Sequence, residues 1–177
     1  MEHPIKAAIN SPHTEQWALS IGKLVLNFAA IELHTYWWLG KLSGDKQLAV
    51  RALSCPFKKR VDHVIELLKA SSLDNESKAT CSALWSEALE LAKIRNAIVH
   101  NPLVFGWPSG NESGPPEVIG IPDLAHLGPK PRISQALASQ AELNIRIDQA
   151  ASIARQLFGQ LDSVASKVVA EGPRSPA

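Results

Sequence analysis

Proline and glycine are distributed very unevenly along this chain of 177 residues, and their positions limit what it can fold into. Residues 102–132 contain seven of the twelve prolines and five of the ten glycines. Both residue types interrupt helices, and the stretches on either side of this segment contain few of them. The sequence therefore predicts an all-α fold, an up-and-down bundle of four to five helices with residues 102–132 as one irregular insertion.

Helix start and stop signals divide the two flanking stretches. Ser11-Pro12 and Asp74 are typical of helix beginnings, and Ser139 forms a capping box with Glu142. Gly44 follows the first apolar repeat and is expected to end that helix. The predicted helices cover roughly residues 12–42, 46–54, 57–70, 74–100 and 139–170, each with apolar residues at helical spacing.

The insertion contains two short apolar segments, Leu103–Trp107 and Glu117–Ile121. These segments can pair as a β-hairpin around Pro108–Pro116. The whole chain fits one domain over residues 1–172, followed by a flexible tail at 173–177.

The charge balance indicates which kinds of partner the chain can bind. Eighteen Lys and Arg against seventeen Asp and Glu give a net charge of +1 with neutral histidines. That value argues against a broad basic coat for nucleic acid, although a small site for phosphate remains compatible with it.

There is no apolar run of about 18 residues and no basic-then-apolar N-terminal signal. We therefore expect no membrane association and a cytoplasmic location.

Common chemical motifs are missing from the sequence. It has no Gly-rich phosphate loop, no His-Glu-x-x-His, no Cys-x-x-Cys and no Gly-x-Ser-x-Gly. The six histidines are scattered, and no two of them have metal-ligand spacing. Two cysteines, Cys55 and Cys81, are too few for a disulfide framework or a Cys-rich zinc site. No metal and no cofactor are predicted.

Arg95 has an unusual position on the helix predicted over 74–100. At 100° per residue it lies in the middle of the apolar side of that helix. A buried guanidinium needs a carboxylate, or else a cleft with water or an anionic ligand. Glu32, midway along the first helix, is a candidate partner for Arg95. The alternative for Glu32 is a solvated position at the edge of the bundle.

His100 and Asn96 accompany Arg95 at the carboxyl end of the same helix. The two residues are four positions apart and share a face, whereas Arg95 is about 140° from His100 around the axis. A second subunit related by a two-fold axis would bring two arginines and two histidines together. The alternative is that His100 simply caps the helix, because a cation is favoured at this end of the helix dipole.

Two other groups of side chains are candidates for contacts. Lys58, Lys59 and Arg60 project near a helix start and could contact an RNA backbone, although such charge runs are usually solvated. Trp37 and Trp38 point about 100° apart, so at most one is central to the core. The other is expected to pack in the core or a dimer interface, with base stacking as the alternative.

The segment Arg95-Asn96-Ala97-Ile98-Val99-His100 resembles the Arg-x(4–6)-His motif of the HEPN superfamily. A polar residue, often Asn, commonly follows the Arg in that family, and the motif lies toward the end of a late helix in a helical bundle. The motif covers six residues, and the helical layout extends the resemblance over roughly 14–100 and 139–170. The segment from Pro102 to Arg132 has no counterpart in the minimal bundle.

The resemblance implies a function as well as a fold. Many members are metal-independent endoribonucleases, including toxins and anti-phage effectors, and work as homodimers with a composite site. By this resemblance Arg95, Asn96 and His100 are the catalytic candidates, Glu32 supports them, and RNA and a cognate antitoxin are expected partners. The products would carry 2′,3′-cyclic phosphate and 5′-hydroxyl ends. Two alternatives remain open: a non-catalytic HEPN-like dimerisation, nucleotide-binding or partner-binding module, and a plain helical scaffold.

Overall fold

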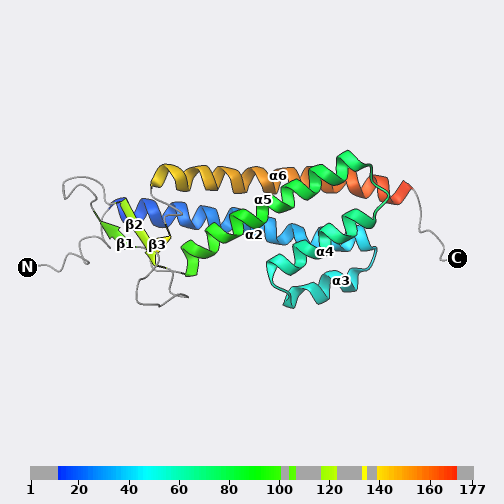
Figure 1. Cartoon of the computed structure of the whole chain (residues 1–177), viewed down its shortest axis with the longest axis horizontal. Helices are drawn as coiled ribbons and strands as arrows, with labels where there is room; N and C mark the ends of the chain where they lie inside the picture. The colour runs from blue at the N-terminus through cyan, green and yellow to red at the C-terminus, as the bar shows by residue number, and fades with distance from the viewer. Residues whose placement is uncertain (1–11, 101–103, 107–116, 123–132, 135–138, 171–177) are drawn as a thin grey trace, which may run out of the picture. The chain divides into compact units, whose positions relative to one another are not determined.

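A computed structural model describes residues 12–100, 104–106, 117–122, 133–134 and 139–170 (Figure 1). These residues are predominantly helical, which confirms the all-α class. The helices are α2 (Pro12–Ser43), α3 (Lys46–Arg51), the 3-10 helix η1 (Ala52–Ser54), α4 (Phe57–Ala70), α5 (Asn75–His100) and α6 (Gln140–Ala170). The strands are β1 (Val104–Gly106), β2 (Glu117–Pro122) and β3 (Ile133–Ser134).

The helix limits agree closely with the capping signals in the sequence. Pro12 is the first residue of α2. The carboxylate of Asp74 accepts a hydrogen bond from the Ser77 backbone N–H at 2.7 Å and so caps α5. The Ser139 hydroxyl accepts one from the Glu142 N–H at 3.2 Å at the start of α6. These bonds satisfy N–H groups that have no partner inside their helix, so local chemistry fixes the helix beginnings.

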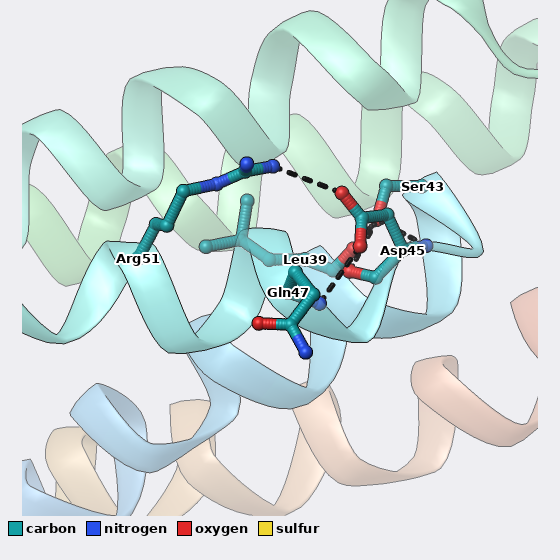
Figure 2. Close-up of polar contacts among 5 residues, drawn as sticks. All are labelled: Leu39, Ser43, Asp45, Gln47 and Arg51. Carbon is teal, nitrogen blue, oxygen red and sulfur yellow. Dashed lines mark hydrogen bonds and ion pairs between the residues drawn. The ribbon is translucent and has the colours of Figure 1, made fainter.

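The turn between α2 and α3 is held by polar contacts on both sides of Gly44 (Figure 2). Gly44 has φ of 65°, a left-handed conformation that glycine adopts at little cost and that ends α2. The Ser43 hydroxyl donates to the carbonyl of Leu39 at 2.6 Å and accepts from the Asp45 N–H at 3.1 Å. One Asp45 oxygen accepts from the Gln47 N–H at 2.7 Å, and the other lies 3.0 Å from the Arg51 guanidinium.

Replacing Asp45 with alanine tests how much this turn depends on its cap. We expect Asp45→Ala to lower the free energy of unfolding by about 1 kcal/mol, because it removes the cap acceptor for α3. Asp45→Asn is the matched control, since asparagine caps equally well but loses the charge pair with Arg51. That exposed pair contributes little, so Asp45→Asn should change stability by less than about 0.5 kcal/mol. Urea unfolding measures both values, and equal losses in the two variants would contradict the capping role.

The chain divides into two compact units. Unit 1 comprises Met1–Leu26 and Leu91–Gln149, and unit 2 comprises Asn27–Glu90 and Ala150–Ala177. Helices α2, α5 and α6 each contribute residues to both units. The predicted single domain over residues 1–172 stays a prediction.

The core of unit 2 is built around Trp38 on α2. Its side chain is fully buried, and its indole N–H donates to the Leu157 carbonyl on α6 at 3.2 Å. Its ring meets the buried Trp85 ring on α5 edge to face, with centroids 5.8 Å apart. Phe28 on α2 meets Phe57 on α4 in the same manner at 5.2 Å. The two aromatic pairs therefore join α2 to α4 and α5, and the indole hydrogen bond joins α2 to α6 within this unit.

Unit 1 contains the strands β1, β2 and β3 and a polar link between α2 and α6. Strand β1 pairs antiparallel with β2, and β2 pairs antiparallel with β3. The third strand was not predicted from the sequence, because a two-residue strand carries no detectable periodicity. The Gln140 amide on α6 donates to the Ser20 hydroxyl on α2 at 2.6 Å. The predicted hairpin loop Pro108–Pro116 and the tail at 173–177 lie outside the described residues.

Candidate functional site

Arg95, Asn96 and His100 occupy the last turns of α5, which ends at His100. Arg95 is half-buried and lies between the buried side chains of Leu91 and Ile98 along one side of the helix. This placement confirms that the apolar side of α5 includes an arginine. Asn101 and Pro102, the predicted stop of this helix, lie outside the described residues.

Asn96 and His100 form the exposed part of this group. Residues four positions apart lie one above the other on a helix, so these two side chains present one amide and one imidazole on the same face. The guanidinium of Arg95 is offset from His100 by about 140° around the axis. One chain thus offers an amide and an imidazole to solvent, and a guanidinium nearer the interior.

Glu32 lies beside a different arginine from the one predicted. Its carboxylate oxygen is 3.8 Å from the guanidinium of Arg60, and both residues belong to unit 2. Glu32 is about one-third exposed, which agrees with a position at the edge of this core. The predicted pair between Glu32 and Arg95 joins two units and stays a prediction.

Arg60 requires a correction, because it was predicted as a surface contact for RNA. Its side chain is only 8% exposed. The guanidinium donates to the Thr35 hydroxyl at 3.0 Å and to the Cys55 carbonyl at 2.7 Å. Its central carbon lies 4.8 Å from the centroid of the Tyr36 ring. The N–H groups of this guanidinium face partners within unit 2, so Arg60 stabilises the packing of α4 against α2.

The sequence did contain a signal for the buried position of Arg60. Residues 60, 64 and 68 follow one another at four-residue steps, and Val64 and Leu68 are both fully buried. Arg60 therefore lies on the inward side of α4. The prediction that Arg60 is a surface contact was wrong because Arg60 follows two lysines, and a run of three basic residues resembles a surface cluster.

Replacing Arg60 with methionine tests this structural role. We expect Arg60→Met to lower the free energy of unfolding by about 1–3 kcal/mol, because the Cys55 carbonyl and the Glu32 carboxylate lose a charged partner. Lys59→Met on the same helix is the control, since Lys59 is exposed and its loss should change stability by less than about 0.5 kcal/mol. Urea unfolding gives both values. Equal stability of the two variants would contradict the account.

Lys58 and Lys59 are the remaining members of the predicted RNA-contact cluster, and both are exposed. The Lys58 ammonium lies 2.7 Å from the Asp62 carboxylate one turn along α4. Such an exposed pair at i, i+4 is weak and can exchange for a phosphate partner. These two lysines therefore stay accessible candidates for backbone contacts.

His34 is a buried titratable group that the sequence reasoning did not select. It lies on α2 and is 5% exposed, with the Trp37 ring 5.1 Å away and the Phe158 ring of α6 6.1 Å away. Burial disfavours the charged imidazolium and lowers the pKa of His34, and a hydrogen bond to the Ala154 backbone offsets this only in part. His34 is therefore neutral at neutral pH and behaves as part of the aromatic packing.

The pKa of His34 predicts that acid weakens the fold. In the unfolded chain this imidazole takes up a proton near its ordinary value of 6.5, whereas in the fold its pKa is lower. Above pH 6.5 the imidazole is neutral in both the folded and the unfolded state. As the pH falls below 6.5, only the unfolded state gains the proton. The free energy of unfolding therefore decreases until the pH reaches the folded pKa. Urea unfolding at about pH 8 and about pH 5 should show this loss in the wild type and a smaller loss in His34→Gln. The half-exposed residue His63 serves as control, and an equal reduction in His63→Gln would contradict the assignment.

Metal sites and membrane spans are both absent from the part of the chain that the structure describes. Among the described residues, no three His, Cys, Asp or Glu side chains gather so that they could hold a metal ion. Within those same ranges, no helix combines the length and apolar character needed to cross a bilayer. Cys55 and Cys81 are both free thiols.

Comparisons with known proteins do not assign a family to this chain. No family model, no curated protein and no solved structure matches it. Functional inference consequently depends on the side chains and their placement alone.

Proposed function

We propose that this protein is a metal-independent endoribonuclease of the HEPN type, with Arg95, Asn96 and His100 as its catalytic residues. The observation that supports this most is the exposure of Asn96 and His100 on one face at the end of α5, with a half-buried Arg95 beside them. An exposed imidazole can reach a substrate, and an amide one turn away can hold a phosphate oxygen or orient the ring.

The proposed chemistry uses only groups that the chain supplies. One imidazole removes the proton from a ribose 2′-hydroxyl, and the 2′-oxygen attacks the adjacent phosphorus. The bond to the 5′-oxygen breaks, and a second imidazole protonates that oxygen as it leaves. The guanidinium of Arg95 stabilises the negative charge that develops on the phosphorane. The products are a 2′,3′-cyclic phosphate and a 5′-hydroxyl, and no water or metal is consumed.

A homodimer completes the proposed site. Two imidazoles are needed, one as base and one as acid, and a two-fold axis across the ends of two α5 helices would supply both. The helices would form one up-and-down HEPN-like domain over residues 1–172, with 102–132 as an insertion. We further propose a cytoplasmic toxin or defence protein with an RNA substrate and a cognate antitoxin. Light scattering tests the dimer, and a monomer at micromolar concentration would remove the composite site.

Cleavage of mixed single-stranded RNA in excess EDTA tests the proposal. The wild type should cleave, and Arg95→Ala should lower the rate by about 10²–10³-fold, as expected for loss of a group that stabilises transition-state charge. Because Arg95 is half-buried, Arg95→Lys provides a second variant that keeps the charge and loses the forked geometry. Arg155→Ala on α6 is the matched control, since Arg155 is exposed and has no proposed role. Unchanged cleavage in Arg95→Ala, or loss of wild-type cleavage with EDTA, would contradict the mechanism.

The alternative of a non-catalytic module makes the opposite prediction. A dimer that binds RNA or a nucleotide and leaves every RNA intact would support that alternative. Growth on expression provides a second readout, because a toxin slows growth unless its antitoxin is present.

A further inference from the structure

Unit 2 contains a cavity of about 540 Å³ between α2, α3 and α6. Four of its lining residues come from α2, one from α3 and one from α6: Tyr36, Trp37, Gly40, Lys41, Ala49 and Leu161. A volume of roughly 300–1,000 Å³ is usual for pockets that bind small molecules. The cavity is therefore large enough for an organic ligand, and all its walls belong to one compact unit.

Two small residues keep this space open. Gly40 on α2 faces Ala49 on α3, and a Cβ atom at Gly40 would lie 3.9 Å from the Ala49 Cβ. That separation is an ordinary van der Waals contact, so a larger residue at position 40 could be accommodated by filling the cavity. The cavity therefore includes the space that a side chain at position 40 would occupy.

Two of the lining residues are aromatic, and neighbouring side chains contact both rings. Trp37 is 43% exposed, and the buried ring of His34 packs edge to face against it at 5.1 Å. The ring of Tyr36 lies under the Arg60 guanidinium at 4.8 Å. Rings fixed by such contacts lose little conformational entropy when a planar ligand packs against them.

Lys41 is the one charged residue in the lining. It is exposed, and within the part of the chain that the structure describes it forms no ion pair. The other lining residues are two aromatic residues, one leucine, one alanine and one glycine. A pocket with apolar walls and one available ammonium group is complementary to a ligand with an apolar body and a single negative charge.

We propose that this cavity binds a small planar organic anion, an aromatic carboxylate, sulfonate or phosphate. Its ring packs against Trp37, and its acidic group pairs with the ammonium of Lys41. The site does not depend on the proposed ribonuclease activity, since Arg95, Asn96 and His100 belong to unit 1. It gives the chain a ligand-binding function in addition to RNA cleavage.

Fluorescence titration of the full chain with 8-anilinonaphthalene-1-sulfonate tests the proposal, because that probe is itself an aromatic anion. We expect one site per chain and binding about tenfold weaker in Lys41→Met, as for loss of one charge-assisted contact. The uncharged probe N-phenyl-1-naphthylamine should bind Lys41→Met and the wild type equally. Gly40→Leu should weaken both probes, because its side chain occupies the cavity.

The controls separate this pocket from general adsorption and from unfolding. Lys69→Met removes an exposed lysine outside the cavity and should leave both affinities unchanged. Circular dichroism and thermal melting establish that each variant is folded. Equal weakening by Lys41→Met and Lys69→Met, or equal loss of both probes in Lys41→Met, would overturn the proposed anion site. Wild-type affinity in a folded Gly40→Leu would overturn the choice of cavity.

Discussion

His100→Ala is expected to lower the rate of RNA cleavage by about 10²–10⁴-fold at saturating RNA, the usual contribution of a general acid or base. His100 is exposed at the end of α5, so its removal should leave the fold intact. The rate loss should therefore appear without a matching loss of stability. Initial rates of cleavage in EDTA, together with urea unfolding, measure the two quantities separately.

His63→Ala is the matched control for that experiment. His63 is a half-exposed histidine, and its ring lies 3.4 Å from the Glu66 carboxylate on α4 in unit 2. It has no role in the proposed site, so cleavage by His63→Ala should equal that of the wild type. Cleavage that survives in His100→Ala, or that falls equally in both variants, would exclude His100 as the catalytic imidazole.

Trp38→Ala is expected to lower the free energy of unfolding by about 3–5 kcal/mol, the usual cost of removing a buried tryptophan. The change leaves a cavity beside Trp85 and leaves the Leu157 carbonyl without the indole donor. Urea unfolding should show a lower midpoint with an unchanged m-value.

The neighbouring residue offers a matched comparison for Trp38. Trp37 has the same side chain one position earlier, but 43% of it is exposed. Trp37→Ala should therefore cost less than half as much stability as Trp38→Ala. Equal losses would contradict the assignment of Trp38 to the core and Trp37 to the surface.

The helix limits could be predicted from the sequence because they depend on residues close to one another along the chain. Gly44 supplies a left-handed turn, and Asp74 and Ser139 each accept from an N–H group three residues later. Such interactions need no knowledge of the tertiary fold. The same local geometry correctly predicted that at most one of Trp37 and Trp38 is central to the core, since neighbours on a helix point about 100° apart.

Contacts between helices could not be predicted in the same way. Arg60 and Glu32 meet the rule that a buried arginine needs a carboxylate, and the sequence did not predict that pair. Whether Arg60 faces Glu32 depends on how α4 packs on α2, and no local pattern specifies that packing. The buried position of His34 and the cavity beside Gly40 depend on helix packing for the same reason.

The candidate catalytic residues could be predicted from the sequence in part. Their shared position at the end of α5 follows from helical periodicity, and the structure agrees with it: Arg95 is half-buried and Asn96 and His100 are exposed. The catalytic role proposed for them requires a second subunit and an RNA strand, and neither is encoded in six residues of helix.

The most direct measurement is mass spectrometry of the fragment ends after the protein has acted on a defined single-stranded RNA in excess EDTA. Attack by the ribose 2′-oxygen predicts fragments that end in a 2′,3′-cyclic phosphate and begin with a 5′-hydroxyl. His100→Ala should yield neither product above background. Fragments with 3′-hydroxyl and 5′-phosphate ends, or identical products from the wild type and His100→Ala, would contradict the proposed function.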